Sequence, residues 1–144
     1  MKYKLYLDNC CFNRPYDDQS SLVIHLETEA KLFIQKEIVN GRFNLVWSYM
    51  LDYENSVNPY ENRRKSIAAW RKLSVVDVDV SSGIVEFAEK IALKGIKKKD
   101  ALHIASAVYA KCDYFLTTDK KLLNKQLEEI KIINPLDFIK ITGE

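Results

Sequence analysis

The chain has 144 residues, of which 47% are hydrophobic and 11% aromatic, so it has the length and apolar content of one folded domain rather than of a disordered or collagen-like chain. Only 4 Gly and 3 Pro are present, which argues against an all-β fold with many turns and favours long elements. The 22 basic and 20 acidic side chains leave a net charge of +2, which neither requires nor excludes a nucleic-acid partner. We expect a single domain over residues 1–144.

Apolar runs such as Ile67–Trp70 are far shorter than the about 20 residues that span a bilayer, so no membrane contact is expected. The start, Met1–Leu5, leads directly into a strand-like pattern and has no signal-peptide core, which predicts a cytoplasmic protein. Cys10, Cys11 and Cys112 lack the spacing of a disulfide framework or a zinc finger and are predicted to be reduced thiols.

Strand-like and helix-like segments alternate along the chain. The expected strands are Tyr3–Asp8, Phe43–Trp47, Val75–Val80, Tyr114–Thr117 and Ile130–Ile133. The expected helices are Leu22–Ile38, Tyr49–Asn55, a segment after Pro59 that buries Ile67, Trp70 and Leu73, Ile84–Leu93, a helix that Asp100 opens, and Lys120–Leu127. The segment Cys10–Gln19 is expected to be a loop. This alternation, with helices as crossovers, predicts an α/β fold whose central parallel sheet is covered by helices on both faces.

Local signals support these boundaries. Ser48 and Ser81 stand where the N-cap of the following helix is expected, and Gly95 is placed to end a helix. Val75–Val80 alternates Val with Asp, which is typical of a half-exposed strand at the edge of a sheet.

Four carboxylates are predicted to gather at one edge of this sheet. Asp8 ends the first strand and Asp119 follows the fourth, and the carboxyl ends of parallel strands form the edge where ligands bind. Glu54 and Asp100 lie on helices close to the same edge. Two unit charges about 4 Å apart repel by about 4 kcal/mol at an effective dielectric of about 20, so a cation is expected, and oxygen ligands favour Mg²⁺ or Mn²⁺ over zinc. Each acid alone could be an ordinary turn or helix-start residue; their joint placement favours a site.

Four stretches, in order, resemble the PIN-domain family. They are Asp8 at the end of the first strand, Ser48 with Glu54 six positions on, Asp100–Ala107, and Phe115–Lys120. The resemblance extends from near residue 3 to near residue 138, and the last two stretches are specific mainly as a pair. PIN domains are three-layer α/β/α sandwiches around a parallel sheet. Many are Mg²⁺- or Mn²⁺-dependent ribonucleases, including the VapC-like toxins of toxin–antitoxin pairs.

The resemblance implies an endoribonuclease that hydrolyses RNA phosphodiester bonds with the help of a divalent metal ion. Its catalytic, metal-binding acids would be Asp8, Glu54, Asp100 and Asp119. Thr117 would support the end of the strand that precedes Asp119. As a toxin, the protein would be held in check by a small antitoxin protein, and a homodimer is compatible with the family. Metal ions held by carboxylates can activate water and stabilise a departing oxygen, so no protein nucleophile is required.

Several positions depart from the family pattern or leave its assignment open. Asn9 stands where many members have Thr or Ser, although it can still offer a hydrogen bond. Asp52 is so close to Glu54 that a shift of register would exchange their roles. His103, one turn after Asp100, is expected to pack against the site or support it.

Basic residues flank the predicted acids on both sides. Lys97, Lys98 and Lys99 precede Asp100, Lys120 follows Asp119, and Arg14 lies in the segment after the first strand. Such runs are often only a solvated face, but beside an acidic pocket they could hold RNA phosphates.

Other classes fit less well. A haloacid-dehalogenase-like phosphatase needs a second Asp where Cys10 stands, and a receiver-like phosphoacceptor fits Asp8, Asn9 and Asp79 only loosely. An acidic neighbourhood raises the pKa of a thiol, which argues against a cysteine nucleophile. The remaining alternative is a PIN-type module that binds RNA or protein without catalysis; the four retained acids argue against it.

Overall fold

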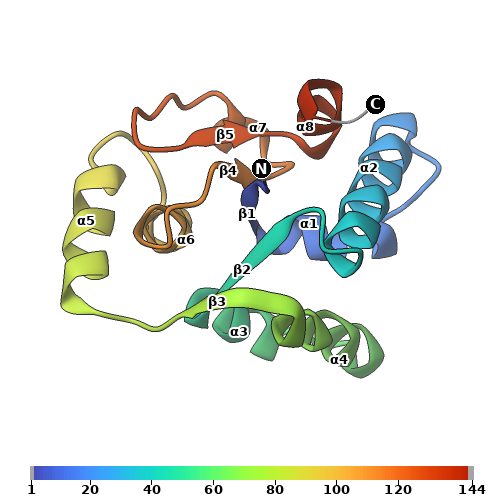
Figure 1. Cartoon of the computed structure of the whole chain (residues 1–144), viewed down its shortest axis with the longest axis horizontal. Coiled ribbons are helices and arrows are strands. Elements are labelled where there is room, and N and C mark those ends of the chain that lie inside the picture. Colours follow the sequence, from blue (N-terminus) through green and yellow to red (C-terminus); the bar gives the residue numbers. More distant parts are fainter. Residues whose placement is uncertain (1, 143–144) are drawn as a thin grey trace.

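A computed structural model describes residues 2–142 and contains a five-stranded sheet in which every pairing is parallel. The strands are β1 (Lys4–Leu7), β2 (Asn44–Ser48), β3 (Ser74–Val78), β4 (Tyr114–Leu116) and β5 (Lys131–Ile133). Their order across the sheet is β3-β2-β1-β4-β5, which places the first strand at the centre (Figure 1). As expected, β3 is an edge strand, and its Val and Asp residues alternate between less and more exposed positions.

Helices cover both faces of the sheet, so the fold is the predicted three-layer α/β/α sandwich. The α-helices are α1 (Asn9–Asn13), α2 (Leu22–Val39), α3 (Tyr49–Ser56), α4 (Glu61–Ala68), α5 (Ser82–Ala92), α6 (Lys98–Tyr109), α7 (Lys120–Leu123) and α8 (Pro135–Thr142). Two short 3₁₀ helices are η1 (Arg14–Tyr16) and η2 (Ala69–Leu73). In Figure 1, α2 and α8 lie on one side of the sheet and α5 and α6 on the other. Within the described part of the chain, no helix combines the length and the apolar character that a bilayer span needs.

The register of the sheet brings the carboxyl ends of β1, β2 and β4 together. Leu7 pairs with Leu116, and the backbone N–H of Asp8 donates to the Leu116 carbonyl at 2.9 Å. The residues that follow these strands therefore start from one edge. The cap of α3 forms as predicted, because the Ser48 hydroxyl accepts from the Leu51 N–H at 3.4 Å.

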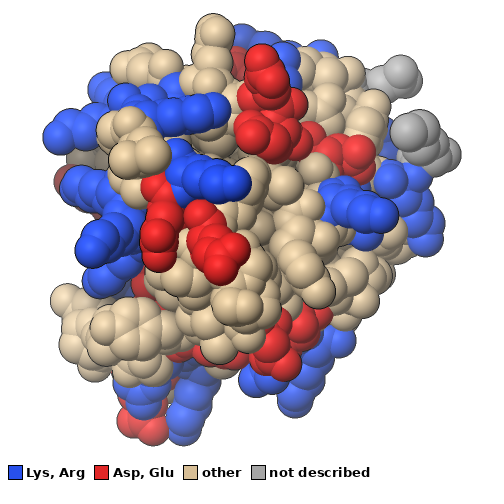
Figure 2. All heavy atoms as spheres, turned by 90° about the vertical axis from the view of Figure 1, so that its left-hand side faces the viewer, with Lys and Arg blue, Asp and Glu red and all other residues tan. Residues whose placement is uncertain are grey.

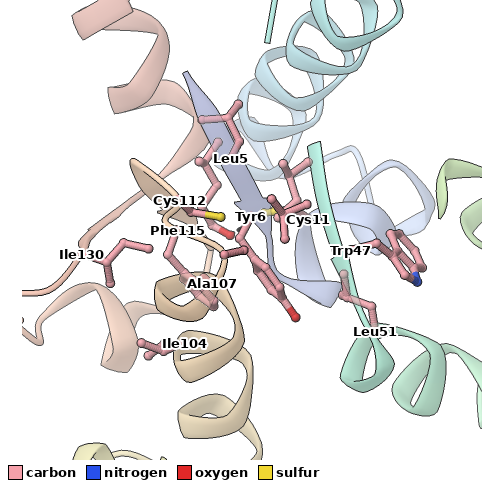
Figure 3. Packing of buried hydrophobic residues seen from close by; sticks show 14 of the residues in the cluster. Leu5, Tyr6, Cys11, Trp47, Leu51, Ile104, Ala107, Cys112, Phe115 and Ile130 are labelled. Carbon is pink, nitrogen blue, oxygen red and sulfur yellow. Dashed lines mark hydrogen bonds between the residues drawn. The ribbon is translucent and has the colours of Figure 1, made fainter. Parts of the chain in front are cut away.

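Aromatic side chains fill the core between the layers. The Tyr6 ring stacks on Phe115 with 5.3 Å between centroids, and Phe12 packs edge-on against Trp47 at 5.4 Å. Figure 3 shows Tyr6 among these buried residues, with its hydroxyl at the end of the ring away from β1. Its hydroxyl therefore reaches the edge of the core, where the polar site begins.

Several sequence predictions need correction. The expected loop Cys10–Gln19 starts with α1 and η1, because the Asp8 side chain caps a short helix by accepting from the Asn9 N–H. The helix expected over Lys120–Leu127 ends at Leu123. Lys97 rather than Asp100 caps α6, and Asp100 lies in its first turn.

Two further elements differ from the sequence prediction. In the helix after Pro59, Ile67 is buried as expected, but Leu73 is 45% exposed because the chain tightens into η2 before β3. The sequence analysis did not predict the C-terminal helix α8, although Asn134 and Pro135 form a start signal: the Asn134 side chain accepts from the Leu136 N–H at 2.8 Å.

We predict that α8 is needed for stability because Phe138 is fully buried and contacts three other aromatic rings, with centroid distances of 6.2 Å to Tyr3, 5.3 Å to Phe43 and 5.2 Å to Tyr114. Phe138→Ala should lower the free energy of unfolding by about 3–5 kcal/mol, measured by urea titration. The matched control is Ile141→Ala on the same helix, where the side chain is 51% exposed and the expected change is within about 0.5 kcal/mol. Equal effects of the two substitutions would contradict this role of α8.

Candidate metal centre

Asp8 is a buried carboxylate held in place by three donors. Only 6% of the residue is exposed. Its Oδ1 accepts from the Asn9 N–H at 2.8 Å, and its Oδ2 accepts from the Thr117 hydroxyl at 2.9 Å and from the Cys10 thiol at 3.6 Å. Thr117 is fully buried and also accepts from the Asp119 N–H at 3.2 Å. Thr117 thus joins the ends of β1 and β4 at the site.

Glu54 and His103 meet across α3 and α6. The Glu54 carboxylate contacts Nε2 of His103, whose side chain is fully buried. The other ring nitrogen, Nδ1, lies 2.5 Å from the Tyr6 hydroxyl, which is 2.6 Å from Ser48 Oγ. If Ser48 donates to Tyr6 and Tyr6 to Nδ1, then Nε2–H donates to Glu54 and every group in the chain is satisfied. These contacts fix the position of Glu54 through the core.

The structure also separates Glu54 from Asp52. Asp52 accepts from the Trp47 indole N–H at 2.9 Å and lies 3.6 Å from an Arg71 guanidinium nitrogen. Residues two apart on a helix point in nearly opposite directions, so only one of the two can face the site. That residue is Glu54.

The Asp8, Glu54 and His103 side chains form a three-donor cluster. One ligand atom from each lies within 4.8 Å of the other two. Two carboxylate oxygens and an imidazole nitrogen suit a divalent cation, and the nitrogen extends the choice from Mg²⁺ towards Mn²⁺ and other transition metals. His103 can be a direct ligand only in its other tautomer, in which Nδ1–H donates to the Tyr6 hydroxyl and Nε2 carries a free lone pair. The sequence analysis did not assign this role to it.

Asp100 and Asp119 lie outside this three-donor cluster but belong to the same acidic site. Burial raises the pKa of Asp100 above its ordinary value of 3.8, and the nearby charges of Asp8, Asp119 and Glu54 raise it further. Asp119 caps α7, where its Oδ1 accepts from the Lys121 N–H at 2.9 Å. Burial likewise raises the pKa of Asp8, and the neighbouring His103 and the hydrogen bond from Thr117 partly offset that rise. The site therefore concentrates negative charge that a cation would neutralise.

A pocket of about 180 Å³ adjoins the acidic residues. Its lining includes two acids, Asp100 and Asp119, and three lysines, Lys97, Lys121 and Lys125. On the face presented by α5, Figure 2 shows Lys and Arg side chains gathered along the left-hand edge. A pocket lined by both carboxylates and lysines suits a phosphate that is bound to a metal ion.

The predicted basic residues separate in the structure. Only Lys97 of the Lys97–Lys99 run lines this pocket; Lys98 lines a groove between α5 and α6, and Lys99 lies over the Tyr53 ring. Lys120 is exposed but does not line the pocket. Arg14 points into the protein, where it pairs with Asp17 at 3.0 Å and Glu27 at 2.8 Å, so its charge is already matched.

The contacts of Asn9 and of Cys11 give these residues supporting roles rather than chemical ones. The Asn9 backbone supports Asp8, whereas its side-chain Oδ1 is buried and, among residues 2–142, has no hydrogen-bond partner. The three cysteines are free thiols as expected. A hydrogen bond with Cys10 and burial raise the pKa of Cys11 well above its ordinary value, and its thiol donates to the Leu116 carbonyl, so Cys11 is not a nucleophile.

Sequence reasoning missed Tyr6 and Lys125. Tyr6 has the pattern of an ordinary core residue of the first strand, and nothing in its sequence context indicates its contact with His103. Lys125 follows α7 and belongs to no motif of the sequence.

Comparison with solved structures places this architecture among known folds. The structure is similar to a chain of VapBC2 from Rickettsia felis, which was crystallised bound to a DNA fragment from its promoter. The TM-score is 0.55 with 13% sequence identity, and the match covers 91% of this chain and 98% of the other. No protein-family model and no curated protein sequence matches the chain. At this identity the likeness is one of fold.

We predict that the charge at Asp100 destabilises the metal-free protein. A carboxyl whose pKa is raised on folding holds its proton more tightly in the folded state, so stability falls as pH rises from the ordinary value of 3.8 through the raised folded value. Asp100→Asn should raise the melting temperature of the metal-free protein at neutral pH and flatten its decline with pH. It should also reduce the further rise on adding Mn²⁺.

Differential scanning fluorimetry across pH, with EDTA or Mn²⁺, measures these effects. Asp137→Asn on α8 is the control, since that carboxylate is 62% exposed and remote in the chain from the acidic site. A Mn²⁺ response in Asp100→Asn equal to that of the wild type would place Asp100 outside the metal centre.

Proposed function

We propose that the chain is a divalent-metal-dependent endoribonuclease that hydrolyses RNA phosphodiester bonds. The observation that carries this proposal is the three-donor cluster of Asp8, Glu54 and His103 at the carboxyl edge of a parallel sheet, adjoined by a pocket that both acids and lysines line. Such an arrangement suits a phosphodiester, because the metal site and the lysines together match its negative charge. Mg²⁺ or Mn²⁺ is the proposed cofactor.

Asp8 and Glu54 would hold the metal ion, with His103 as a further ligand in the tautomer that leaves Nε2 unprotonated, and Asp100 and Asp119 would add carboxylates beside it. When bound, the ion supplies Lewis-acid stabilisation of the charge that develops on the phosphate oxygens. Thr117 and the Asn9 N–H hold Asp8, and the chain from Ser48 through Tyr6 and His103 holds Glu54, so both acids are oriented before substrate binds.

Within this proposal, Asp100 has the properties of the proton acceptor. Hydrolysis forms a bond from a water oxygen to phosphorus and breaks the bond to the leaving ribose oxygen, which takes up a proton. Asp100 is half-buried and lines the pocket, so its carboxylate would be placed to accept a proton from a water molecule there. Lys97, Lys121 and Lys125 would position the phosphate for attack.

The same proposal includes a role as a VapC-like PIN-domain toxin. It rests on the fold likeness to the VapBC2 structure and on the motif resemblance around Asp8, Asp100 and Asp119. The partners proposed with this role are RNA as substrate, a small antitoxin protein as inhibitor and a second copy of the chain in a homodimer. A cytoplasmic location stays a prediction. The acids that line one site argue against the alternative of a PIN-type binding module without catalysis.

Asp8→Asn and Asp119→Asn should each reduce Mn²⁺-dependent cleavage of a mixed RNA panel by about 100-fold or more, because each removes a negative charge from the metal site. Circular dichroism should show an intact fold. EDTA should abolish wild-type cleavage, and Asp137→Asn should cleave like the wild type. Near wild-type cleavage by either folded site variant would refute the metal-site assignment.

Replacing Lys97, Lys121 and Lys125 together by Gln should weaken the binding of unrelated RNA sequences about equally. The slope of log affinity against log salt should become shallower by about 0.7 for each lysine that contacts a phosphate. The matched control replaces Lys2, Lys111 and Lys131, which are exposed and precede or begin strands at the opposite edge of the sheet. The same loss of affinity in both triple variants would show that only net charge matters.

A further inference from the structure

Three tyrosines are exposed on the elements that follow the carboxyl ends of β1 and β2. Tyr53 on α3 is 53% exposed, Tyr60 at the N-cap of α4 is 58% exposed, and Tyr16 in η1 is 43% exposed. Burial of an aromatic ring is strongly favourable in water, so three rings left exposed on elements that contact or follow one another call for an explanation.

Tyr53 lies at the edge of the metal centre and is paired with a lysine. The Lys99 ammonium is 5.8 Å from the centre of the Tyr53 ring, which connects α3 to the first turn of α6. Their chain neighbours are Glu54 and Asp100, two acids of the site, and successive residues of a helix are only about 1.5 Å apart along its axis. A ring and a cation therefore stand together beside the position proposed for the cleaved phosphate.

Tyr16 and Tyr60 are joined by an arginine. The Arg63 guanidinium carbon lies 4.6 Å from the centre of the Tyr16 ring and 4.2 Å from that of Tyr60. Its Nε is buried and, in the part of the chain that is described, has no hydrogen-bond partner. The guanidinium packs against both rings, so it restricts their motion and reduces the entropy that a ligand would lose on stacking against them.

The two cations in this region are not neutralised by the protein. Across residues 2–142, neither Lys99 nor Arg63 has a carboxylate within 4.0 Å, whereas Arg14, Arg42 and Arg71 each have at least one. Exposed aromatic rings alternating with unneutralised cations are the composition of surfaces that bind single-stranded nucleic acid, in which bases stack on rings and phosphates contact the cations.

We propose that Tyr16, Tyr53 and Tyr60, with Lys99 and Arg63, form a tyrosine surface on which bases of single-stranded RNA stack beside the metal centre. Tyr53 with Lys99 receives the nucleotide next to the cleaved phosphate, and Tyr60 with Arg63 and Tyr16 receives bases further along the strand. The proposal rests on the proposed ribonuclease function and specifies its substrate as unpaired RNA. Bases in a duplex are stacked on each other and cannot lie on these rings.

The test measures binding of a fluorescein-labelled single-stranded RNA of about 12 nucleotides by anisotropy, using the full chain with Asp119→Asn so that the RNA stays intact. Tyr53→Ala and Tyr60→Ala should each weaken binding by about 5- to 100-fold, which corresponds to stacking energies of about 1–3 kcal/mol per base. Tyr53→Phe should bind normally because the ring is kept. Tyr109→Ala is the matched control: Tyr109 is 66% exposed but ends α6 far along the helix from Asp100.

Three further readouts separate stacking from other causes. An abasic oligomer of the same length should bind the parent and Tyr53→Ala equally, and Tyr53→Ala should leave the salt slope unchanged, whereas Lys99→Gln should reduce it by about 0.7. Weaker binding of the abasic oligomer by Tyr53→Ala would overturn the stacking role. The stacking role would also be overturned if Tyr53→Ala and Tyr60→Ala bound RNA as tightly as Tyr109→Ala does. This includes the case in which the two variants lose binding only to a partner protein.

The outcomes also distinguish this inference from the proposed function. Wild-type protein that cleaves RNA, together with tyrosine variants that bind it normally, refutes the tyrosine surface alone. Wild-type protein that neither binds nor cleaves any RNA in the presence of Mn²⁺ refutes the ribonuclease proposal and the tyrosine surface with it.

Discussion

Repulsion among carboxylates that are confined to one edge of the sheet is the constraint on which the rest of the site depends. Asp8 is almost fully buried, and Asp100 is near enough to Asp8, Asp119 and Glu54 for their charges to raise its pKa. Folding therefore brings together carboxylates that repel each other, and a bound cation would reduce that repulsion. In the proposed ribonuclease, stability is given up for a prepared metal site, as is common where function requires strain or unfavourable charge.

The core and the site are connected through one buried polar chain. Tyr6 stacks on Phe115 within the core and contacts both Ser48 and His103 with its hydroxyl, and His103 in turn contacts Glu54. Burying these polar groups is tolerable only because each has a partner. A central strand, the cap of α3 and the middle of α6 are thereby fixed relative to each other, and the position of Glu54 follows from that geometry.

The likeness to the VapBC2 chain shows how little sequence this architecture requires. With 13% identity and a TM-score of 0.55, the two chains share a fold over nearly their whole lengths. The helices and strands are set by apolar periodicity and caps, which many sequences satisfy. The features on which the proposals rest, namely His103 in the three-donor cluster and tyrosines alternating with cations, are particular to the residues of this chain.

The sequence by itself determined the class of fold, the order of most elements and the edge at which the acids meet, because hydrophobic periodicity and caps such as Ser48 and Ser81 are local. It could not decide between Asp52 and Glu54, distinguish a packing from a supporting role for His103, or recognise Tyr6 as part of the site. It also could not divide the lysines between a pocket, a groove and an aromatic ring. These outcomes depend on the rotation of each helix about its axis and on which helices meet, since a side chain moves by about 100° for each residue along a helix. Only the packing of α3 and α6 against the central strand fixes those angles.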